Sequence, residues 1–306
     1  MTKNKIIALG ETTYDIIFKE NKPVDGIVGG SQLNSAVSLG RMGLPVYFVS
    51  QIGNDKIGEI CKNFLKENNI NTGFVNRFRG NSRISLAFLD NKNDATYSFY
   101  TGGEATELNF PVIDNGDFLL FGSSFARRMD IRESLKNFIQ LFGDKQNITV
   151  YDPNYRRSRA KNIDNIRDIT LENFTMSNII KGSDEDFYNL FEIKGASEIY
   201  NDVLKSPGDK VLIYTRGADG VDVMGPGINL HYPVKPINAV STIGAGDNFS
   251  AGMLYGLYMK NISMDNLFSL NESTWHYILS KATSFAGHVC QGFDNYITNE
   301  FAEINK

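Results

Sequence analysis

The stretch Ser241-Thr242-Ile243-Gly244-Ala245-Gly246-Asp247 is the most informative part of this 306-residue sequence. Small and apolar residues follow Asp247 and predict a helix that starts beside it. Gly244 and Gly246 allow backbone amides to face a ligand, and a helix start adds unpaired N–H groups and the positive end of its dipole. The stretch therefore predicts an anion cradle suited to a transferring phosphoryl group.

Two interpretations of Asp247 follow from its place at this helix start. An aspartate there ordinarily caps the helix by accepting a backbone N–H. Beside a bound phosphate, the same carboxylate can instead accept a proton from an attacking hydroxyl group. The glycine spacing alone leaves both interpretations open.

Missing fingerprints and a near-neutral charge exclude several classes of protein. The sequence has no GxxxxGK[ST] and no GxGxxG after a predicted strand, so P-loop NTPases and GxGxxG dinucleotide-binding domains lack their motif. Its 31 basic and 35 acidic residues leave a net charge of -4, which offers no basic footprint for nucleic acid or an anionic membrane. A phosphate-bearing ligand must therefore be held by local groups.

Cysteine, histidine and apolar residues are too few or too scattered for three further kinds of feature. Two cysteines cannot build a disulfide framework, and the three histidines lack metal-ligand spacing. No apolar run approaches the roughly 20 residues that span a bilayer, and the run Ile6–Leu9 is too short for a signal peptide. We therefore expect a cytoplasmic protein.

Short buried strands alternate with amphipathic helices along most of the chain, which predicts a parallel sheet covered on both faces. The predicted strands are Ile6–Gly10, Pro45–Ile52, Phe118–Phe121, Ile148–Tyr151, Met176–Ile180 and Val211–Tyr214, and the clearest helices are Ser31–Met42 and Ile57–Asn68. Arg83–Leu89 and Ala95–Tyr100 instead predict a hairpin. It could be a flap over a site, a dimer contact or a solvent-facing decoration.

A second motif lies far upstream, from Gly29-Gly30-Ser31-Gln32-Leu33-Asn34 to Gly53-Asn54-Asp55. Together with Gly244-Ala245-Gly246-Asp247 it resembles the two signatures of the PfkB (ribokinase-like) family of ATP-dependent sugar kinases. The resemblance implies a ribokinase-like three-layer α/β/α fold with a mostly parallel central sheet. It also implies a single domain over 1–306, with a small β lid from about 12–28 and 80–105.

The resemblance assigns catalytic roles to the C-terminal signature. Asp247 matches the catalytic base that takes a proton from a primary hydroxyl group. Gly244, Ala245 and Gly246 match the anion hole that stabilises the γ-phosphoryl group during transfer. The capping alternative for Asp247 is the one that this resemblance disfavours.

The resemblance places the sugar against the N-terminal half of the chain. Asp15 matches the aspartate that binds sugar hydroxyl groups, while Gly29, Gly30 and Asn34 match positions that line the sugar pocket. A carboxylate can accept two hydroxyl hydrogen bonds at once, and glycine lets a ring approach the backbone. From the residues alone, Asp15 could equally end a strand and Asn34 could be an ordinary polar residue in the first turn of a helix.

The resemblance also implies sites for ATP and Mg²⁺. Thr215, Gly217 and Gly220 lie in a T-x-G-x-x-G turn, which could otherwise be an ordinary glycine turn. Ser183-Asp184-Glu185-Asp186 stands in place of the family's Asn-x-x-Glu motif. By this match Ser183 would lie beside ATP and Asp186 would hold Mg²⁺ through water. Glu185 is the alternative residue for Mg²⁺. Ser241 stands where the family has an aspartate, which puts activation by K⁺ in question.

The acceptor is expected to be a small neutral sugar, and fructose is the leading candidate. Asp152-Pro153-Asn154-Tyr155-Arg156 resembles the fructokinase and 2-keto-3-deoxygluconate kinase branches, in which Arg156 would contact the acceptor; it could also be a surface cation. Thr101 stands where keto-acid kinases tend to carry an arginine, and a buried carboxylate without a cation is costly.

Three alternatives for the function stay open in the sequence. The chain could phosphorylate a keto-deoxy acid, or a nucleoside or aminoimidazole riboside, or it could be a sugar or nucleotide sensor without turnover.

The hairpin Arg83–Tyr100 carries apolar residues on both faces, and two-stranded ribbons are only marginally stable alone in water. We therefore expect a homodimer formed through the lid.

Overall fold

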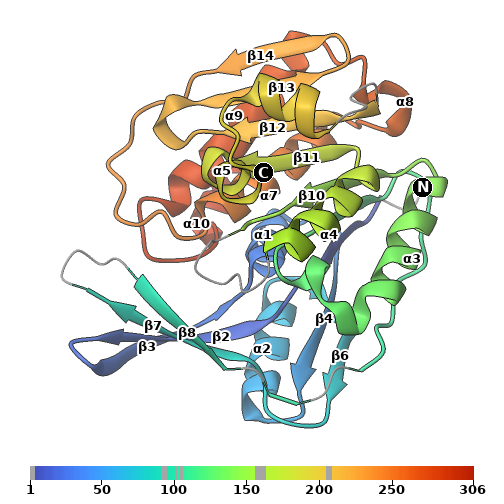
Figure 1. The fold of residues 1–306 in the computed structure, drawn as a ribbon. Helices are drawn as coiled ribbons and strands as arrows, with labels where there is room; N and C mark the ends of the chain where they lie inside the picture. The colour runs from blue at the N-terminus through green and yellow to red at the C-terminus, as the bar shows by residue number, and fades with distance from the viewer. Residues whose placement is uncertain (1–3, 91–94, 101, 104–105, 156–162, 205–208) are drawn as a thin grey trace.

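A large, mostly parallel sheet, the main sheet, runs through the molecule (Figure 1). The computed structural model describes residues 4–90, 95–100, 102–103, 106–155, 163–204 and 209–306. Strand order is β14-β13-β12-β11-β10-β9-β1-β4-β5, with β6 paired to β4; only the pairs β12–β13 and β13–β14 are antiparallel. The strands are β14 (Ile228–Tyr232), β13 (Val221–Gly225), β12 (Val211–Thr215), β11 (Ile179–Ser183), β10 (Ile148–Asp152), β9 (Phe118–Gly122), β1 (Ile6–Leu9), β4 (Val46–Gly53), β5 (Ile70–Asn71) and β6 (Val75–Phe78).

Helices cover both faces of the main sheet because successive side chains of its strands point to opposite faces and both sets are apolar. Ile6 and Ala8 of β1 pack into one core, and Ile7 and Leu9 into the other. The first core includes residues of α1 (Ser31–Arg41), α2 (Lys56–Glu67), α7 (Ala245–Met259), α8 (Met264–Leu267), α9 (Glu272–Val289) and α10 (Asn299–Asn305). The second includes residues of α3 (Arg132–Asp144), α4 (Ile163–Thr175), α5 (Asp184–Phe191), α6 (Ala196–Glu198) and the short turns Phe125–Arg127, Met129–Ile131 and Ile199–Val203. This is the expected three-layer arrangement.

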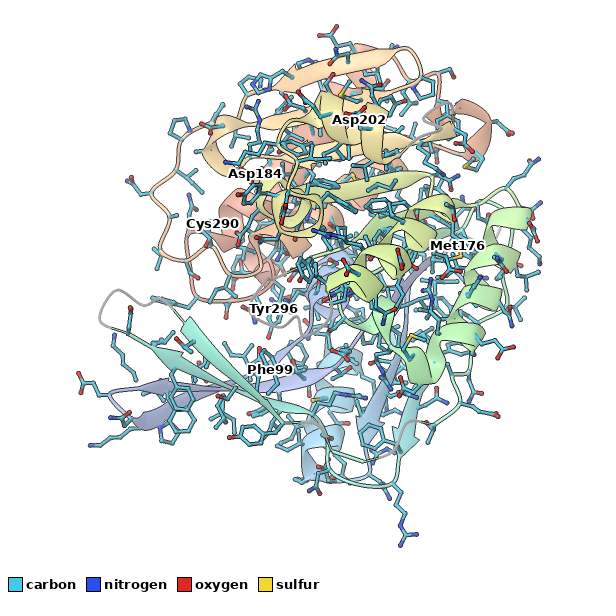
Figure 2. All side chains as sticks on the ribbon, in the orientation of Figure 1. Phe99, Met176, Asp184, Asp202, Cys290 and Tyr296 are labelled. Carbon is cyan, nitrogen blue, oxygen red and sulfur yellow. The ribbon has the colours of Figure 1, made fainter. Side chains whose placement is uncertain are left out.

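A second sheet of four strands, the small sheet, projects from one side of the molecule (Figure 1). Its order is β3 (Lys22–Gly29), β2 (Thr13–Lys19), β7 (Ile84–Leu89) and β8 (Ala95–Tyr100). Strands β7 and β8 form the predicted hairpin, and β2 pairs with β7 in parallel. Phe99 lies out on this sheet, well away from Asp184 on the main body (Figure 2).

One strand prediction was displaced by three residues. The sequence predicted a strand over Met176–Ile180, whereas α4 continues to Thr175 and β11 starts at Ile179. The amides of Met176 and Ser177 still donate to Asn173 and Phe174 carbonyl oxygens of the last helical turn. Met176 is therefore the end of an apolar helix face, and the strand continues instead through Lys181 to Ser183.

Among the helices that the structure describes, none is both long and apolar enough to cross a bilayer.

Candidate active site

Helix α7 starts at the predicted anion cradle. Its N-cap is Gly244, with φ of 79°, a left-handed conformation that favours glycine. A Cβ atom there would also approach the carbonyl oxygen of Asn295 to 2.9 Å. No side chain caps α7, and Asp247 is the third residue of the helix rather than its cap. The capping interpretation of Asp247 is therefore wrong, and its carboxylate is committed elsewhere.

The Asp247 carboxylate accepts hydrogen bonds from three side chains that are distant in sequence. Ser31 Oγ donates to Oδ1 at 2.7 Å, and Asn34 Nδ2 donates to Oδ2 at 2.8 Å. Asn154 Nδ2 donates to Oδ1 at 3.1 Å, from the loop after β10. The carboxylate is buried, and this burial raises the pKa of Asp247 to about 6 against the opposing effect of Asn34 and Ser31. A carboxylate whose pKa lies near neutrality suits a general base.

Two glycines set the approach of α1 to this carboxylate. Gly30 is the N-cap of α1 with φ of 139°, and a Cβ atom there would come within 2.1 Å of the Glu11 carbonyl oxygen. At Gly29 a Cβ atom would lie 2.8 Å from Oδ2 of Asp15. Glycine is therefore required at position 30, where the chain enters α1 and leads to Asn34, while at position 29 a side chain would displace the Asp15 carboxylate.

Asp15 lies on β2, with its side chain facing the main body of the molecule. Ser85 Oγ of β7 donates to Asp15 Oδ1 at 2.6 Å, and Thr13 Oγ1 donates at 3.1 Å. Asp15 lines a narrow pocket between the small sheet and the loops before α7 and after α9, whose other lining residues are Ile17, Ile27, Ala87, Leu89, Ser241, Ile243, Phe293 and Asn295. The small sheet therefore closes over the segment that leads into the anion cradle.

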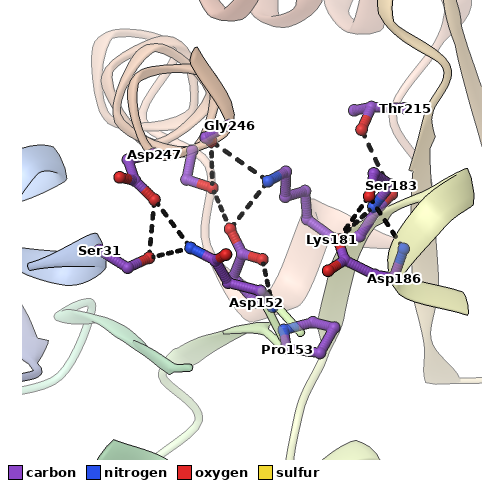
Figure 3. Close-up of polar contacts among 12 residues, drawn as sticks. Ser31, Asp152, Pro153, Lys181, Ser183, Asp186, Thr215, Gly246 and Asp247 are labelled. Carbon is purple, nitrogen blue, oxygen red and sulfur yellow. Dashed lines mark hydrogen bonds and ion pairs between the residues drawn. The ribbon is translucent and has the colours of Figure 1, made fainter. Parts of the chain in front are cut away.

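A buried ion pair lies under the anion cradle. Lys181 Nζ of β11 is 2.8 Å from Asp152 Oδ2 of β10 and donates to the Gly246 carbonyl oxygen at 3.2 Å (Figure 3). Ser250 Oγ donates to Asp152 Oδ2 at 3.0 Å. Burial disfavours the Lys181 ammonium, but the carboxylates of Asp152 and Asp186 outweigh it and raise the pKa of Lys181. The ammonium therefore stays charged at neutral pH.

The predicted ATP and Mg²⁺ residues gather at the ends of β11 and β12. Ser183 and Thr215 are direct partners across the two strands. Asp186 forms a capping box with Ser183, accepting from its N–H at 2.8 Å and its hydroxyl at 2.7 Å, and also accepts from the Tyr155 N–H at 2.6 Å (Figure 3). A carboxylate has about four acceptor positions, so these three hydrogen bonds leave Asp186 with one more.

The glycine turn after β12 is tightly folded. The short turn Gly217–Asp219 follows the strand, and the Arg216 N–H donates to the Gly220 carbonyl oxygen at 2.9 Å. Gly217 and Gly220 both have positive φ, 53° and 101°. No atom would lie within 4 Å of a Cβ atom at Gly217, so this side of the turn is open to a ligand.

Glu185 points to a different surface from Asp186. It is exposed and lines a hollow of about 450 Å³ together with Asp184, Tyr188, Lys194, Gly195, Tyr214, Arg216 and Asp222. Asp247 and Asp15 do not line that hollow. Within the described residues, no three His, Cys, Asp or Glu side chains are grouped to hold a metal ion.

Two residues used in the sequence argument, Arg156 and Thr101, lie outside the described residues. In contrast, the structure adds Ser31, Asn154 and Asn295 to the site. Ser31 and Asn154 each lie in a motif quoted above, so the motifs could have identified them as candidate site residues. Asn295 had no sequence signal, because only the fold brings its loop against Gly244.

Known proteins that are similar to this chain include carbohydrate kinases. A family model described as pfkB family carbohydrate kinase matches residues 3–291. A fructokinase of Rhizobium leguminosarum bv. trifolii is 29% identical over 266 residues, covering 84% of this chain and 81% of that protein. A 5-dehydro-2-deoxygluconokinase of Clostridium beijerinckii is 23% identical, covering 98% and 95%.

Solved structures share the fold. The crystal structure of aminoimidazole riboside kinase from Salmonella enterica, complexed with aminoimidazole riboside and an ATP analogue, superposes with a TM-score of 0.82 at 18% identity. The match covers 98% of this chain and 99% of that one, which confirms the ribokinase-like α/β fold. The chain therefore belongs to the pfkB family of carbohydrate kinases, phosphotransferases that use an alcohol group as acceptor.

Proposed function

We propose that this carbohydrate kinase transfers the γ-phosphoryl group of ATP to a primary hydroxyl group of a small neutral sugar. Fructose is the leading candidate for this acceptor. One observation carries the proposal: the buried Asp247 carboxylate, whose pKa is raised to about 6, lies in the first turn of a helix that no side chain caps. A base and an anion-binding helix start are thereby joined in one turn.

Asp247 and Asp15 divide the work on the acceptor. Asp15 binds sugar hydroxyl groups in the pocket beneath the small sheet, beside Gly29, Gly30 and Asn34. Asp247 takes the proton of the attacking hydroxyl as its oxygen bonds to the γ-phosphorus and the bond to the bridging oxygen of ADP breaks.

The anion hole and the nucleotide motifs act on ATP. The backbone at Gly244, Ala245 and Gly246 stabilises the negative charge of the transferring group. Ser183, Thr215, Gly217 and Gly220 bind the nucleotide, because they lie at the ends of neighbouring strands and in the open turn after β12. Asp186 would hold Mg²⁺ through water, with Glu185 as the alternative. The ion, when bound, neutralises phosphate charge.

The small sheet acts as a lid in this proposal, and residues 1–306 work as one kinase domain. Its face with Asp15, Ile17 and Ala87 closes the acceptor pocket and excludes water, so that ATP is not hydrolysed. Arg156 would contact the acceptor.

The opposite face of the small sheet supports the homodimer that we propose. The strand register puts Ile16 beside Leu86 and Phe18 beside Phe88, with the two aromatic rings 5.0 Å apart. Phe88 is 37% exposed. A second copy of the sheet would cover this apolar face through an isologous contact, the commonest kind in homo-oligomers.

The acceptor pocket also bears on the acid alternative. Its described lining contains the Asp15 carboxylate and no lysine or arginine. Arg83 is turned toward Phe78, with its guanidinium carbon 5.4 Å from the ring centroid. Desolvating a substrate carboxylate in this pocket would be costly, so a neutral acceptor is favoured over a 5-dehydro-2-deoxygluconate-like acid.

An ADP-release assay with MgATP and single acceptors tests the proposed function. The panel contains D-fructose, D-ribose, 2-keto-3-deoxygluconate, 5-dehydro-2-deoxygluconate and aminoimidazole riboside. We expect the highest kcat/KM with fructose. A preference for either acid would contradict the neutral-sugar proposal, a preference for the riboside would assign the chain to the riboside kinases, and no turnover with any acceptor would support a sensor.

Dependence on K⁺ is tested in the same assay. Since Ser241 replaces the family's aspartate, exchanging potassium chloride for choline chloride should change turnover little. A large stimulation by K⁺ would contradict this and would indicate that backbone carbonyl oxygens suffice to hold the ion.

A further inference from the structure

One ammonium group and three carboxylates meet where β10, β11, α5 and α7 converge. Lys181 is buried and interacts electrostatically with Asp152, Asp186 and Asp247. The mechanism above assigns tasks to Asp186 and Asp247 but none to Lys181 or Asp152. Figure 3 shows the Lys181 side chain extending from β11 to a position between Asp152 and the start of α7.

The direction of the Lys181 hydrogen bonds is informative. Its ammonium donates to Asp152 at 2.8 Å and to the Gly246 carbonyl oxygen at 3.2 Å. Ser250 Oγ reaches the same carbonyl oxygen at 3.3 Å. Burying an ion pair is expensive, and an apolar pair of similar volume often stabilises a fold as well or better. Stability alone therefore does not explain a charged pair that ends on the backbone of the anion hole.

We propose that Lys181 is a positioning residue for phosphoryl transfer: anchored on Asp152, its ammonium holds the Gly246 carbonyl group, and with it the backbone amides that face the phosphoryl group, and its charge favours the ionised form of Asp247. This inference rests on the proposed function, since it needs Asp247 to act as the base.

The groups that face Asp247 make the charge effect separable. Ser31 and Asn34 of α1 and Asn154 after β10 are neutral donors. Among the described residues, the charged groups that act on the carboxylate are Asp152 of β10, which raises the pKa of Asp247, and Lys181 of β11, which lowers it. Removing one member of the ion pair at a time should therefore move this pKa in opposite directions.

The decisive comparison is Asp152→Asn against the double variant Asp152→Asn/Lys181→Met. Both lack the buried Asp152 carboxylate, so uptake of a proton by Asp152 cannot disguise the result. Carbon-13 NMR of protein labelled at the aspartate carboxyl carbon, with Asp247→Asn to identify the resonance, gives the pKa of Asp247 directly. We expect the pKa in Asp152→Asn to be lower than in wild type, and lower than in the double variant by about one unit or more.

Kinetics with MgATP and D-fructose test the positioning part. The double variant should lose about 10- to 100-fold in kcat relative to Asp152→Asn, as when a supporting contact of a site residue is removed. Ser250→Ala removes the hydroxyl group that donates to Asp152 at 3.0 Å and lies 3.3 Å from the Gly246 carbonyl oxygen, and it removes no charge. It should lower kcat several-fold and shift the pKa of Asp247 less than the removal of Lys181 does.

Lys210→Met is the matched control for loss of a buried lysine. Lys210 directly precedes β12, and its ammonium donates to the carbonyl oxygen of Ser177, which precedes β11, at 3.1 Å. It should lower the melting temperature without changing the pKa of Asp247 or kcat.

Equal Asp247 pKa values in Asp152→Asn and the double variant would overturn the electrostatic part, and equal kcat values would overturn the positioning part. The NMR titration needs no acceptor, so a wild-type protein that does not turn over fructose would contradict the proposed acceptor and leave the titration result standing. If the double variant does not fold, Ser250→Ala with unchanged kcat overturns the positioning part, and Asp152→Asn with an Asp247 pKa no lower than in wild type overturns the electrostatic part.

Discussion

The surroundings of Asp247 and the small sheet that carries Asp15 are built in opposite ways. Asp247 is held by side chains from α1 and from the loop after β10, above a buried ion pair. Asp15 lies on a four-stranded sheet whose outer strand is exposed, with Phe99 and Tyr100 43% and 53% exposed. In the function that we propose, the phosphoryl end of the site is therefore preorganised by buried contacts, whereas the acceptor end is formed by a partly exposed sheet.

This contrast fits what each end has to recognise. The γ-phosphoryl group and the hydroxyl group that attacks it are common to all acceptors, so fixed dipoles and a fixed base suit this step. Acceptors differ from one another by a few hydroxyl contacts, and such contacts can be changed on a sheet without disturbing the core. The four predictions that follow test this division, from the largest expected effect to the smallest.

Asp247→Asn removes the proposed base from the preorganised end of the site. The amide cannot accept the hydroxyl proton, so kcat should fall by about 10²- to 10⁴-fold, the usual range for a lost general base, while the protein stays folded. Turnover and melting temperature are measured on the same preparation. Asp265→Asn, an exposed aspartate on α8, is the matched control and should behave as wild type. Near wild-type turnover of Asp247→Asn would refute its role as base.

Asp15→Ala removes the proposed sugar-binding carboxylate from the acceptor end of the site. Losing hydrogen bonds to a charged group should raise KM for the sugar by about 10- to 100-fold and leave the Kd of an ATP analogue nearly unchanged. Titrating the two ligands separately distinguishes these effects. Asp25→Ala removes an exposed carboxylate from β3 of the same sheet and should change neither value. An equal loss for both ligands would place Asp15 outside the acceptor site.

The acid limb of the pH profile tests whether the base alone sets the activity. Because burial raises the pKa of Asp247 to about 6, the carboxylate is protonated, and inactive as a base, below that pH. Activity should therefore be constant above pH 7 and fall about tenfold per pH unit below 6. We expect this limb in kcat/KM for wild type and for Asp15→Ala alike. A limb near pH 4 would contradict the burial effect.

Phe88→Lys tests the outer face of the small sheet and should change catalysis least. A charge on this apolar face should shift the dimer to monomer in light scattering at micromolar concentration, with kcat changing only a few-fold. Leu141→Lys, at a position of α3 that is 52% exposed, is the matched control and should leave the dimer intact. A monomeric wild type would refute the dimer, and a dimer that survives Phe88→Lys would move the interface elsewhere.

Local patterns in the sequence were sufficient to predict the architecture. The alternation of apolar strands with amphipathic helices predicted the parallel sheet, and glycines at 30 and 244 marked backbone conformations that other residues rarely adopt. The two signatures predicted the family, because each is a continuous segment whose spacing is written in the chain itself. The error at Met176 arose because an apolar helix end and a buried strand start have the same composition.

Only the tertiary structure decided what Asp247 does with its carboxylate. Its hydrogen-bond donors Ser31 and Asn34 lie 216 and 213 residues away, and Lys181 reaches Asp152 only because β10 and β11 are neighbours in the sheet. Strand order and register determine these contacts, and neither can be inferred from local spacing. The sequence by itself therefore determined which residue could be the base, while the fold determined its partners and its raised pKa, since burial is a property of the packed molecule.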